Sequence, residues 1–194
     1  YYLASSNLAE IIVVFMGMLM GWTDYAGNPF VPLSAVQILW INLASDALPA
    51  VALGMDPIDP KAMQRPPRKP NIHLISRSKA LHLLSISFVI AVGTLVACYI
   101  GMQHSAELAQ TMAFTTLVVL ELIAVQIIRA PYNLSLFSNP FIIAAVTISF
   151  VLQLFIVYTP LLQRVFNTVP LTVKDWGAIT VITIIGWMVC DLIN

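Results

Sequence analysis

Charged side chains are scarce in this sequence. Only 9% of its 194 residues are Asp, Glu, Lys or Arg, whereas soluble domains carry roughly 25%. Hydrophobic residues make up 59% of the chain, and a soluble protein so poor in charge would have too little polar surface to cover its core. The composition therefore excludes an ordinary soluble domain and indicates that lipid is the surrounding solvent.

Cysteine and histidine are also rare, with 2 and 3 copies respectively. Cys98 and Cys190 lie in apolar runs far apart in the sequence, so we interpret both as small buried hydrophobic residues and not as a disulfide or a metal pair. His73, His82 and His104 fall in loops or at the predicted membrane edges. The polar residues discussed below have no His or Cys among them, which argues against zinc or copper.

Long apolar runs, by contrast, are abundant. A membrane-spanning helix needs about 20 mostly apolar residues, and six runs separated by proline-rich or polar stretches meet this requirement. The sequence therefore predicts an all-α fold, a polytopic transmembrane bundle of six helices. Because the chain opens inside an apolar pattern without a basic leader, we expect it to begin partway into a helix of a longer protein. The predicted helices cover about residues 3–21, 33–54, 80–101, 106–129, 140–158 and 175–193.

The basic residues indicate the orientation of the bundle. Most of them fall in one connection, residues 55–79, between the second and third predicted helices. Cytoplasmic loops of membrane proteins are enriched in Lys and Arg, so this connection is predicted to be cytoplasmic. Alternation of six helices then places both chain termini on the cytoplasmic side. The basic residues of this connection are Lys61, Arg65, Arg68, Lys69, Arg77 and Lys79.

Three carboxylates stand inside apolar runs, where they are expensive. An acid at the centre of a membrane helix costs about 2.5 to 3.5 kcal/mol even on the lenient insertion scale. Glu10, Asp46 and Glu121 each lie within roughly ten residues of the middle of a predicted span. Ionisable residues in such positions are functional by default, so these three carboxylates define the candidate site.

Other oxygen-bearing side chains accompany the acids. Asn7 is three residues from Glu10, and Asn42 is four residues from Asp46, so each pair shares a helix face. Ser45 directly precedes Asp46. Carboxylate, amide and hydroxyl oxygens suit hard cations such as calcium, which takes six to eight of them.

Proline also marks the helix that carries Asp46. Pro49 has no backbone N–H and frees a carbonyl near that carboxylate, and an interrupted helix beside a carboxylate is a recurring design of cation sites in transporters. Gln126 lies a little over one turn beyond Glu121. The alternative interpretation is a set of interhelical hydrogen bonds with protonated acids, which is less favoured for three acids and two amides on three helices.

Four stretches resemble P-type cation pumps. The sixth transmembrane helix of that family is similar to the run Gln37-Ile-Leu-Trp-Ile-Asn-Leu-Ala-Ser-Asp-Ala-Leu-Pro-Ala-Val-Ala-Leu-Gly54, and its following cytoplasmic loop to residues 55–70 with their Arg-Pro-Pro-Arg signature. The stretch 5–10 resembles the fifth helix, and 111–122 the eighth. The likeness covers essentially the whole chain, as the fifth to tenth helices of a calcium pump of the reticulum type.

The resemblance implies a ligand set for two calcium ions. Asp46 would be shared between the two sites, Glu10 and Glu121 would belong to the first, and Asn42 to the second. Asn42 favours calcium over sodium and potassium, and Glu10 favours the two-site pattern. Ala47 replaces the Gly of those pumps after Asp46, which leaves the degree of helix unwinding open. The implied metal ligands are Asn7, Glu10, Asn42, Ser45, Asp46 and Glu121.

The resemblance also implies what lies outside this chain. The intact pump would use ATP and magnesium to phosphorylate an aspartate in a cytoplasmic domain, and no Asp-Lys-Thr-Gly phosphorylation motif occurs here. The chain alone should therefore be inactive. Its expected partners are membrane lipid and the rest of the pump, with loop 55–76 contacting the phosphorylation domain, and no nucleic acid. We expect an integral multi-pass protein, of the plasma membrane if prokaryotic. A pump for sodium, protons or manganese, or a stand-alone ion or proton transporter, are the alternatives.

Overall fold

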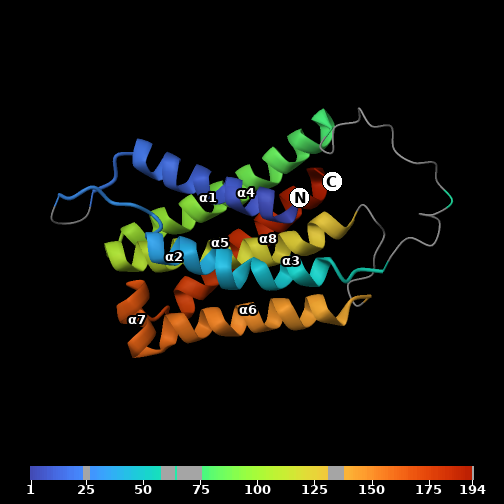
Figure 1. Ribbon diagram of the computed structural model, residues 1–194. Coiled ribbons are helices and arrows are strands. Elements are labelled where there is room, and N and C mark those ends of the chain that lie inside the picture. The colour runs from blue at the N-terminus through green and yellow to red at the C-terminus, as the bar shows by residue number, and fades with distance from the viewer. Residues whose placement is uncertain (24–26, 58–63, 65–75, 131–137, 194) are drawn as a thin grey trace.

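Six long helices dominate the structure (Figure 1). The computed structural model describes residues 1–23, 27–57, 64, 76–130 and 138–193, and this part contains no strand, only an isolated bridge between Thr23 and Pro29. The predicted all-α class is confirmed, because six helices of the described part are long and apolar enough to cross a membrane. Five are continuous: α1 (Tyr2–Leu19), α4 (Arg77–Met102), α5 (Ala106–Arg129), α6 (Pro140–Tyr158) and α8 (Val173–Ile193).

The remaining long helix is broken in its middle. It consists of α2 (Ala35–Trp40), a π-helical turn η1 (Ile41–Ser45) and α3 (Ala47–Leu53), with Asp46 between the last two. Its first turn is fixed by a capping box, because the Ser34 hydroxyl accepts from the Gln37 N–H while the Gln37 side chain accepts from the Ser34 N–H. The helix therefore begins at a well-defined position, and its departure from α-helical geometry is confined to its centre.

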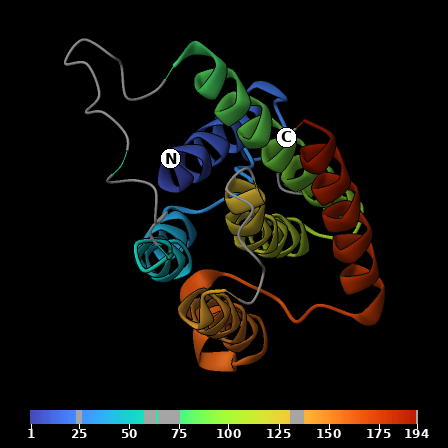
Figure 2. The same ribbon diagram turned by 90° about the vertical axis from the view of Figure 1, so that its right-hand side faces the viewer.

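Helix α5 lies at the centre of the bundle. Figure 2 shows it surrounded by α1, α2 with α3, α4, α6 and α8. Most of its residues are buried, including polar ones such as Thr111 and Thr115. The outer helices expose large apolar side chains, among them Leu43, Phe88 and Val181. Such an apolar exterior is the surface that lipid requires, and the protein is an integral, multi-pass membrane protein.

Helices α4 and α5 form a tight antiparallel hairpin, as the short connection 103–105 predicts. A methyl group on Gly101 would come within 2.6 Å of the Ala109 Cα atom, so only glycine allows the two backbones to approach this closely. The Ser105 hydroxyl accepts from the Leu108 N–H and caps the start of α5. Since α5 carries Glu121, this hairpin helps to fix the height of that carboxylate in the bundle.

A short additional helix, α7 (Pro160–Phe166), occupies a stretch that the prolines predict to be a loop. Pro160 stands in the first turn of this helix, where the missing N–H has no partner to lose. The helix ends at Asn167, which has a left-handed backbone with φ of 52°. Prolines therefore mark a helix start here and not the absence of one.

Both chain termini lie at the same end of the bundle, together with the end of α3 and the start of α4 (Figure 1). This agrees with an even number of crossings. Of the basic connection 55–79, residues 58–63 and 65–75, including the Arg-Pro-Pro-Arg signature, lie outside the described residues.

Candidate metal centre

Three carboxylates from three helices meet inside the bundle. Glu10 comes from α1, Asp46 from the break between η1 and α3, and Glu121 from α5. One oxygen of each lies within 4.8 Å of one oxygen of each of the other two. Glu10 is 5% exposed, while Asp46 and Glu121 are fully buried. The acids that are most expensive in a membrane are thus gathered at one point.

The spacing of these oxygens suits a single calcium ion. Calcium–oxygen distances of about 2.3 to 2.6 Å allow two ligands of one ion to be at most about 5.2 Å apart, and the cluster lies within that limit. Three ionised carboxylates so close together in a buried site repel one another and need a counter-charge. A bound cation supplies that counter-charge and is coordinated by the same oxygens.

The broken helix places Asp46 at this point. The Asp46 N–H donates to the Ile41 carbonyl, five residues back, at 2.9 Å, which is the hydrogen bond of a π-turn. Pro49 leaves the Ser45 carbonyl without its α-helical donor, and the Ser149 hydroxyl of α6 lies 3.4 Å from that oxygen. The carbonyl that the sequence predicts to be free is therefore contacted by a neighbouring helix. Although Asp46 is followed by Ala47 and not by the more flexible glycine, the helix is interrupted over one π-turn and Asp46.

Two polar side chains hold the carboxylates in place. The Tyr2 hydroxyl donates to Asp46 Oδ1 at 2.9 Å. Asn42 Nδ2 donates to both carboxylate oxygens of Glu10, at 3.1 and 2.8 Å, and to the Ile38 carbonyl at 3.0 Å. These contacts connect α1 with the broken helix inside its π-turn, at Asn42, and directly after it, at Asp46.

Several buried oxygens of the site have no hydrogen-bond partner within the described part of the chain. They are Asp46 Oδ2, both carboxylate oxygens of Glu121 and the Ser45 hydroxyl. An unpartnered buried oxygen is costly in water-free surroundings. A cluster of such oxygens is what an oxygen-coordinated cation requires, so the donor set fits a hard metal ion.

The six sequence-predicted ligands divide into two groups. The structure brings Glu10, Asp46 and Glu121 together and places Asn42 in contact with Glu10. Ser45 is buried next to Asp46. By contrast, Asn7 is exposed on α1.

Sequence reasoning missed Tyr2, because a tyrosine near a helix end gives no signal of a partner 44 residues away. Gln126, noted for its closeness to Glu121, accepts instead from Arg129 Nη1 at 2.9 Å. That arginine belongs to a second polar cluster, nearer the end of the bundle where both termini lie. The sequence alone indicates only that Arg129 ends an apolar run.

The second cluster is centred on a buried ion pair. Arg129, 2% exposed, donates to both carboxylate oxygens of Asp56 at 3.0 Å each. Its guanidinium also donates to the Ser138 hydroxyl at 2.8 Å, and Asn139 Nδ2 donates to Asp56 Oδ1 and to the Ala52 carbonyl, each at 2.9 Å. The cluster joins the ends of α3 and α5 to the start of α6.

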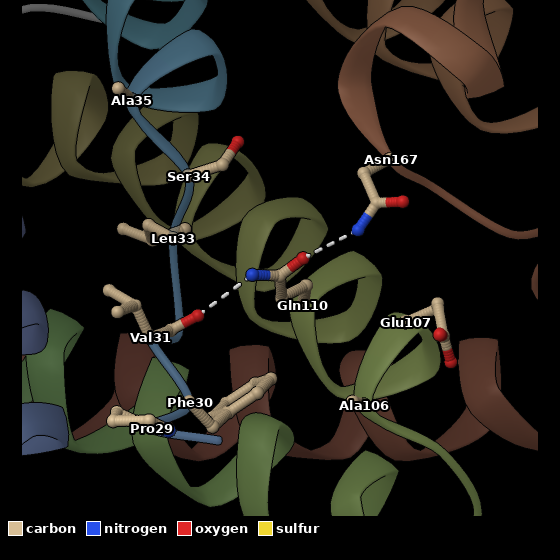
Figure 3. A pocket seen from close by; sticks show the side chains of 10 residues that line it. All are labelled: Pro29, Phe30, Val31, Leu33, Ser34, Ala35, Ala106, Glu107, Gln110 and Asn167. Atoms are coloured by element: carbon tan, nitrogen blue, oxygen red, sulfur yellow. Dashed lines mark hydrogen bonds between the residues drawn. The ribbon is translucent and has the colours of Figure 1, made fainter. Parts of the chain in front are cut away.

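A pocket at the opposite end of the bundle is separate from both clusters. Its volume is about 470 Å³, and it lies between the stretch 29–35, the start of α5 and Asn167 (Figure 3). Gln110 donates to the Val31 carbonyl at 2.9 Å and accepts from Asn167 Nδ2 at 3.1 Å. Glu107 lies at its edge (Figure 3). With one exposed acid, this pocket lacks the convergent buried oxygens of the carboxylate cluster.

Buried acids gathered at a helix break, inside an apolar bundle, define the class of this protein. It is a polytopic helical membrane protein with three carboxylates gathered in its interior, an arrangement typical of ion transporters.

The comparisons identify the family. Residues 30–194 match the family described as cation transporting ATPase, C-terminus. A calcium-transporting ATPase of Bacillus subtilis (strain 168) is 39% identical over 181 residues, which is 90% of this chain and 20% of that protein. Calcium-transporting ATPase 1 of Bacillus cereus is 32% identical over 215 residues, covering 100% of this chain and 23% of that protein. Calcium-transporting ATPase type 2C member 1 of Mus musculus is 30% identical over 177 residues, 88% of this chain and 18% of that protein.

The chain therefore belongs to the P-type cation-transporting ATPase family, as part of its C-terminal membrane region. The resemblance predicted from the helix motifs is confirmed. The chain spans about a fifth of the length of these curated relatives.

Proposed function

We propose that this chain is the cation-binding membrane part of an ATP-driven calcium pump. The observation that carries the proposal is the cluster of Glu10, Asp46 and Glu121, three buried carboxylates from three helices with oxygens within 4.8 Å of one another. Its oxygen-only donor set favours calcium, and several relatives are named as calcium-transporting ATPases.

The proposed ligand set serves two ions. Glu10 and Glu121 bind the first, Asn42 contributes to the second, and Asp46 lies between them and serves both. The Ser45 hydroxyl is a further ligand. The unpartnered oxygens of Ser45, Asp46 and Glu121 support these three residues as ligands. To act as a ligand, Asn42 turns its amide oxygen to the ion and releases the Glu10 carboxylate, which its Nδ2 contacts here.

Asn7 is the sixth proposed ligand. It is exposed in this chain, and helices from the remainder of the pump are proposed to cover this face of α1. The loop 55–76 is proposed to contact the phosphorylation domain, with both termini on the cytoplasmic side. ATP and magnesium bind outside this chain, which on its own hydrolyses nothing.

The test is calcium-stimulated phosphorylation of the full-length pump by ATP. Asp46→Asn removes the shared carboxylate, and the phosphorylated intermediate should then no longer form at calcium concentrations that saturate the wild type. Asp191→Asn, an exposed acid near the end of α8, is the matched control and should behave as wild type.

The same assay identifies the ion. Calcium should stimulate phosphorylation, whereas sodium at physiological concentration should not. Manganese, as the alternative divalent ion, is tested in the same assay. Stimulation by sodium alone, or full calcium stimulation in Asp46→Asn, would contradict the proposed site.

A further inference from the structure

We propose that Arg129 is a positioning residue of the pump, which keeps the helices of Asp46 and Glu121 in one fixed relative position. The inference rests on the proposed function and extends it to a residue that contacts no ion. It follows from the ion pair with Asp56 and from the location of that pair relative to the carboxylate cluster.

The contacts of Arg129 are unusually complete. All three of its side-chain nitrogens donate: Nε to Asp56 Oδ2, Nη2 to Asp56 Oδ1 and to Ser138, and Nη1 to Gln126, at 2.8 to 3.0 Å. The side chain is buried, with 2% exposed. A planar guanidinium bound to a carboxylate through two parallel hydrogen bonds resists both sliding and rotation of the partner.

The pair connects the two ligand-bearing helices at their ends. Arg129 follows Glu121 by eight residues on α5, about 12 Å along the axis at 1.5 Å per residue. Asp56 stands three residues beyond Leu53, the last residue of α3, whose first residue follows Asp46. A displacement of the end of α3 is therefore passed to α5, and Asp46 and Glu121 move together.

Helix α6 takes part in the same unit. Asn139 caps the start of α6 and donates to the Ala52 carbonyl and to Asp56. Ten residues further along α6, Ser149 contacts the Ser45 carbonyl beside the carboxylate cluster. The broken helix is thus attached to α6 at two points, through the Ala52 carbonyl at the end of α3 and through the Ser45 carbonyl at the π-turn. It is attached to α5 through Arg129.

A purely structural ion pair would give a different result from a positioning device. Loss of a structural pair lowers the amount of folded protein but leaves the calcium affinity of the folded fraction unchanged. Loss of a positioning pair changes the calcium affinity itself. Since removal of one partner leaves a buried charge uncompensated, single variants risk misfolding. The double variant Arg129→Met with Asp56→Leu removes both charges together and avoids this problem.

The experiment uses the full-length pump in membranes and measures phosphorylation in two ways. Phosphorylation by ATP is titrated with calcium. Phosphorylation by inorganic phosphate is measured without calcium, so it does not depend on calcium binding at the carboxylate cluster. In the double variant, the calcium concentration for half-maximal phosphorylation by ATP should rise roughly tenfold, which corresponds to about 1.4 kcal/mol. The level reached with inorganic phosphate should stay within twofold of wild type.

Two further variants sharpen the result. Arg129→Lys keeps the charge but not the two parallel hydrogen bonds, and should shift the calcium dependence in the same direction by a smaller factor. Arg164→Met replaces an exposed arginine of α7 and should leave it unchanged. An unchanged calcium dependence in the double variant would overturn the proposal.

The failure of this inference differs from that of the proposed function. If the wild-type pump showed no calcium-stimulated phosphorylation, the calcium site itself would be refuted. If the wild type responded to calcium and the double variant responded identically, only the role of Arg129 would be refuted.

Discussion

Replacement of Glu121 by Gln removes one negative charge from the carboxylate cluster and keeps the size of the side chain and one oxygen ligand. Glu121 is fully buried, and both of its oxygens lack a hydrogen-bond partner in the described part of the chain. The change therefore acts on the interaction with the ion and disturbs no existing hydrogen bond.

The magnitude follows from three terms. At an effective dielectric constant of about 20, a carboxylate about 2.4 Å from a doubly charged ion gains about 14 kcal/mol. Glu10 and Asp46 have oxygens within 4.8 Å of Glu121, so repulsion from each offsets at least about 3.5 kcal/mol. Burial of the charge costs several kcal/mol more. The remainder is about 3 kcal/mol, which corresponds to roughly a hundredfold change in calcium affinity.

The assay is the calcium dependence of phosphorylation by ATP in the full-length pump. The calcium concentration for half-maximal phosphorylation should rise about a hundredfold in Glu121→Gln. Glu107→Gln is the matched control, because Glu107 lies on the same helix but is exposed in its first turn. It should change the calcium dependence by less than twofold.

Phosphorylation by inorganic phosphate without calcium serves as the measure of folding in both variants. A Glu121→Gln pump that is phosphorylated normally in this way, and that keeps a calcium dependence within threefold of wild type, would refute the assignment of Glu121 as a ligand.

Two further predictions concern the support of the site. Tyr2→Phe removes the hydrogen bond to Asp46 Oδ1, worth about 1 kcal/mol, and should weaken calcium affinity about fivefold in the same titration; equal affinity would show that the hydroxyl does not position the carboxylate. Gly101→Ala places a methyl group within 2.6 Å of the Ala109 Cα atom and should destabilise the pump by about 1 to 3 kcal/mol, measured as faster thermal inactivation. Gly177→Ala, with nothing within 4 Å of the added atom, should inactivate no faster than the wild type, because alanine favours the helix. Equal rates for the two variants would contradict the close packing.

The core of the site could be predicted because membranes make acids conspicuous. Glu10, Asp46 and Glu121 stand out from apolar surroundings by their cost alone, and the structure brings all three together. The helices follow from the same apolar runs, since α5 and α6 occupy the residues that hydrophobicity indicates. Where one free-energy term is as large as the cost of an acid in a membrane, the sequence alone is enough to predict the feature.

The rest could not be predicted because it depends on contacts between distant residues. The Arg129–Asp56 pair spans 73 residues, and no local pattern marks either member as a partner of the other. The exposure of Asn7 could not be predicted either. Asn7 and Glu10 share a helix face, but this does not determine whether a neighbouring helix covers both of them. Proline at the start of α7 was misleading for a related reason, since its meaning depends on the position in the helix.

The π-turn at Ile41–Ser45 makes the site sensitive to the number of residues as well as to their identity. The π-turn already accommodates one extra residue between Ile41 and Asp46. One α-helical residue advances the chain by 100°, so insertion of one further residue in α2 would turn Asp46 away from Glu10 and Glu121. The composition and hydrophobicity of the helix would hardly change, and every carboxylate would still be present. A comparison of relatives by residue type alone would count such a protein as having an intact site, although the carboxylates would no longer converge.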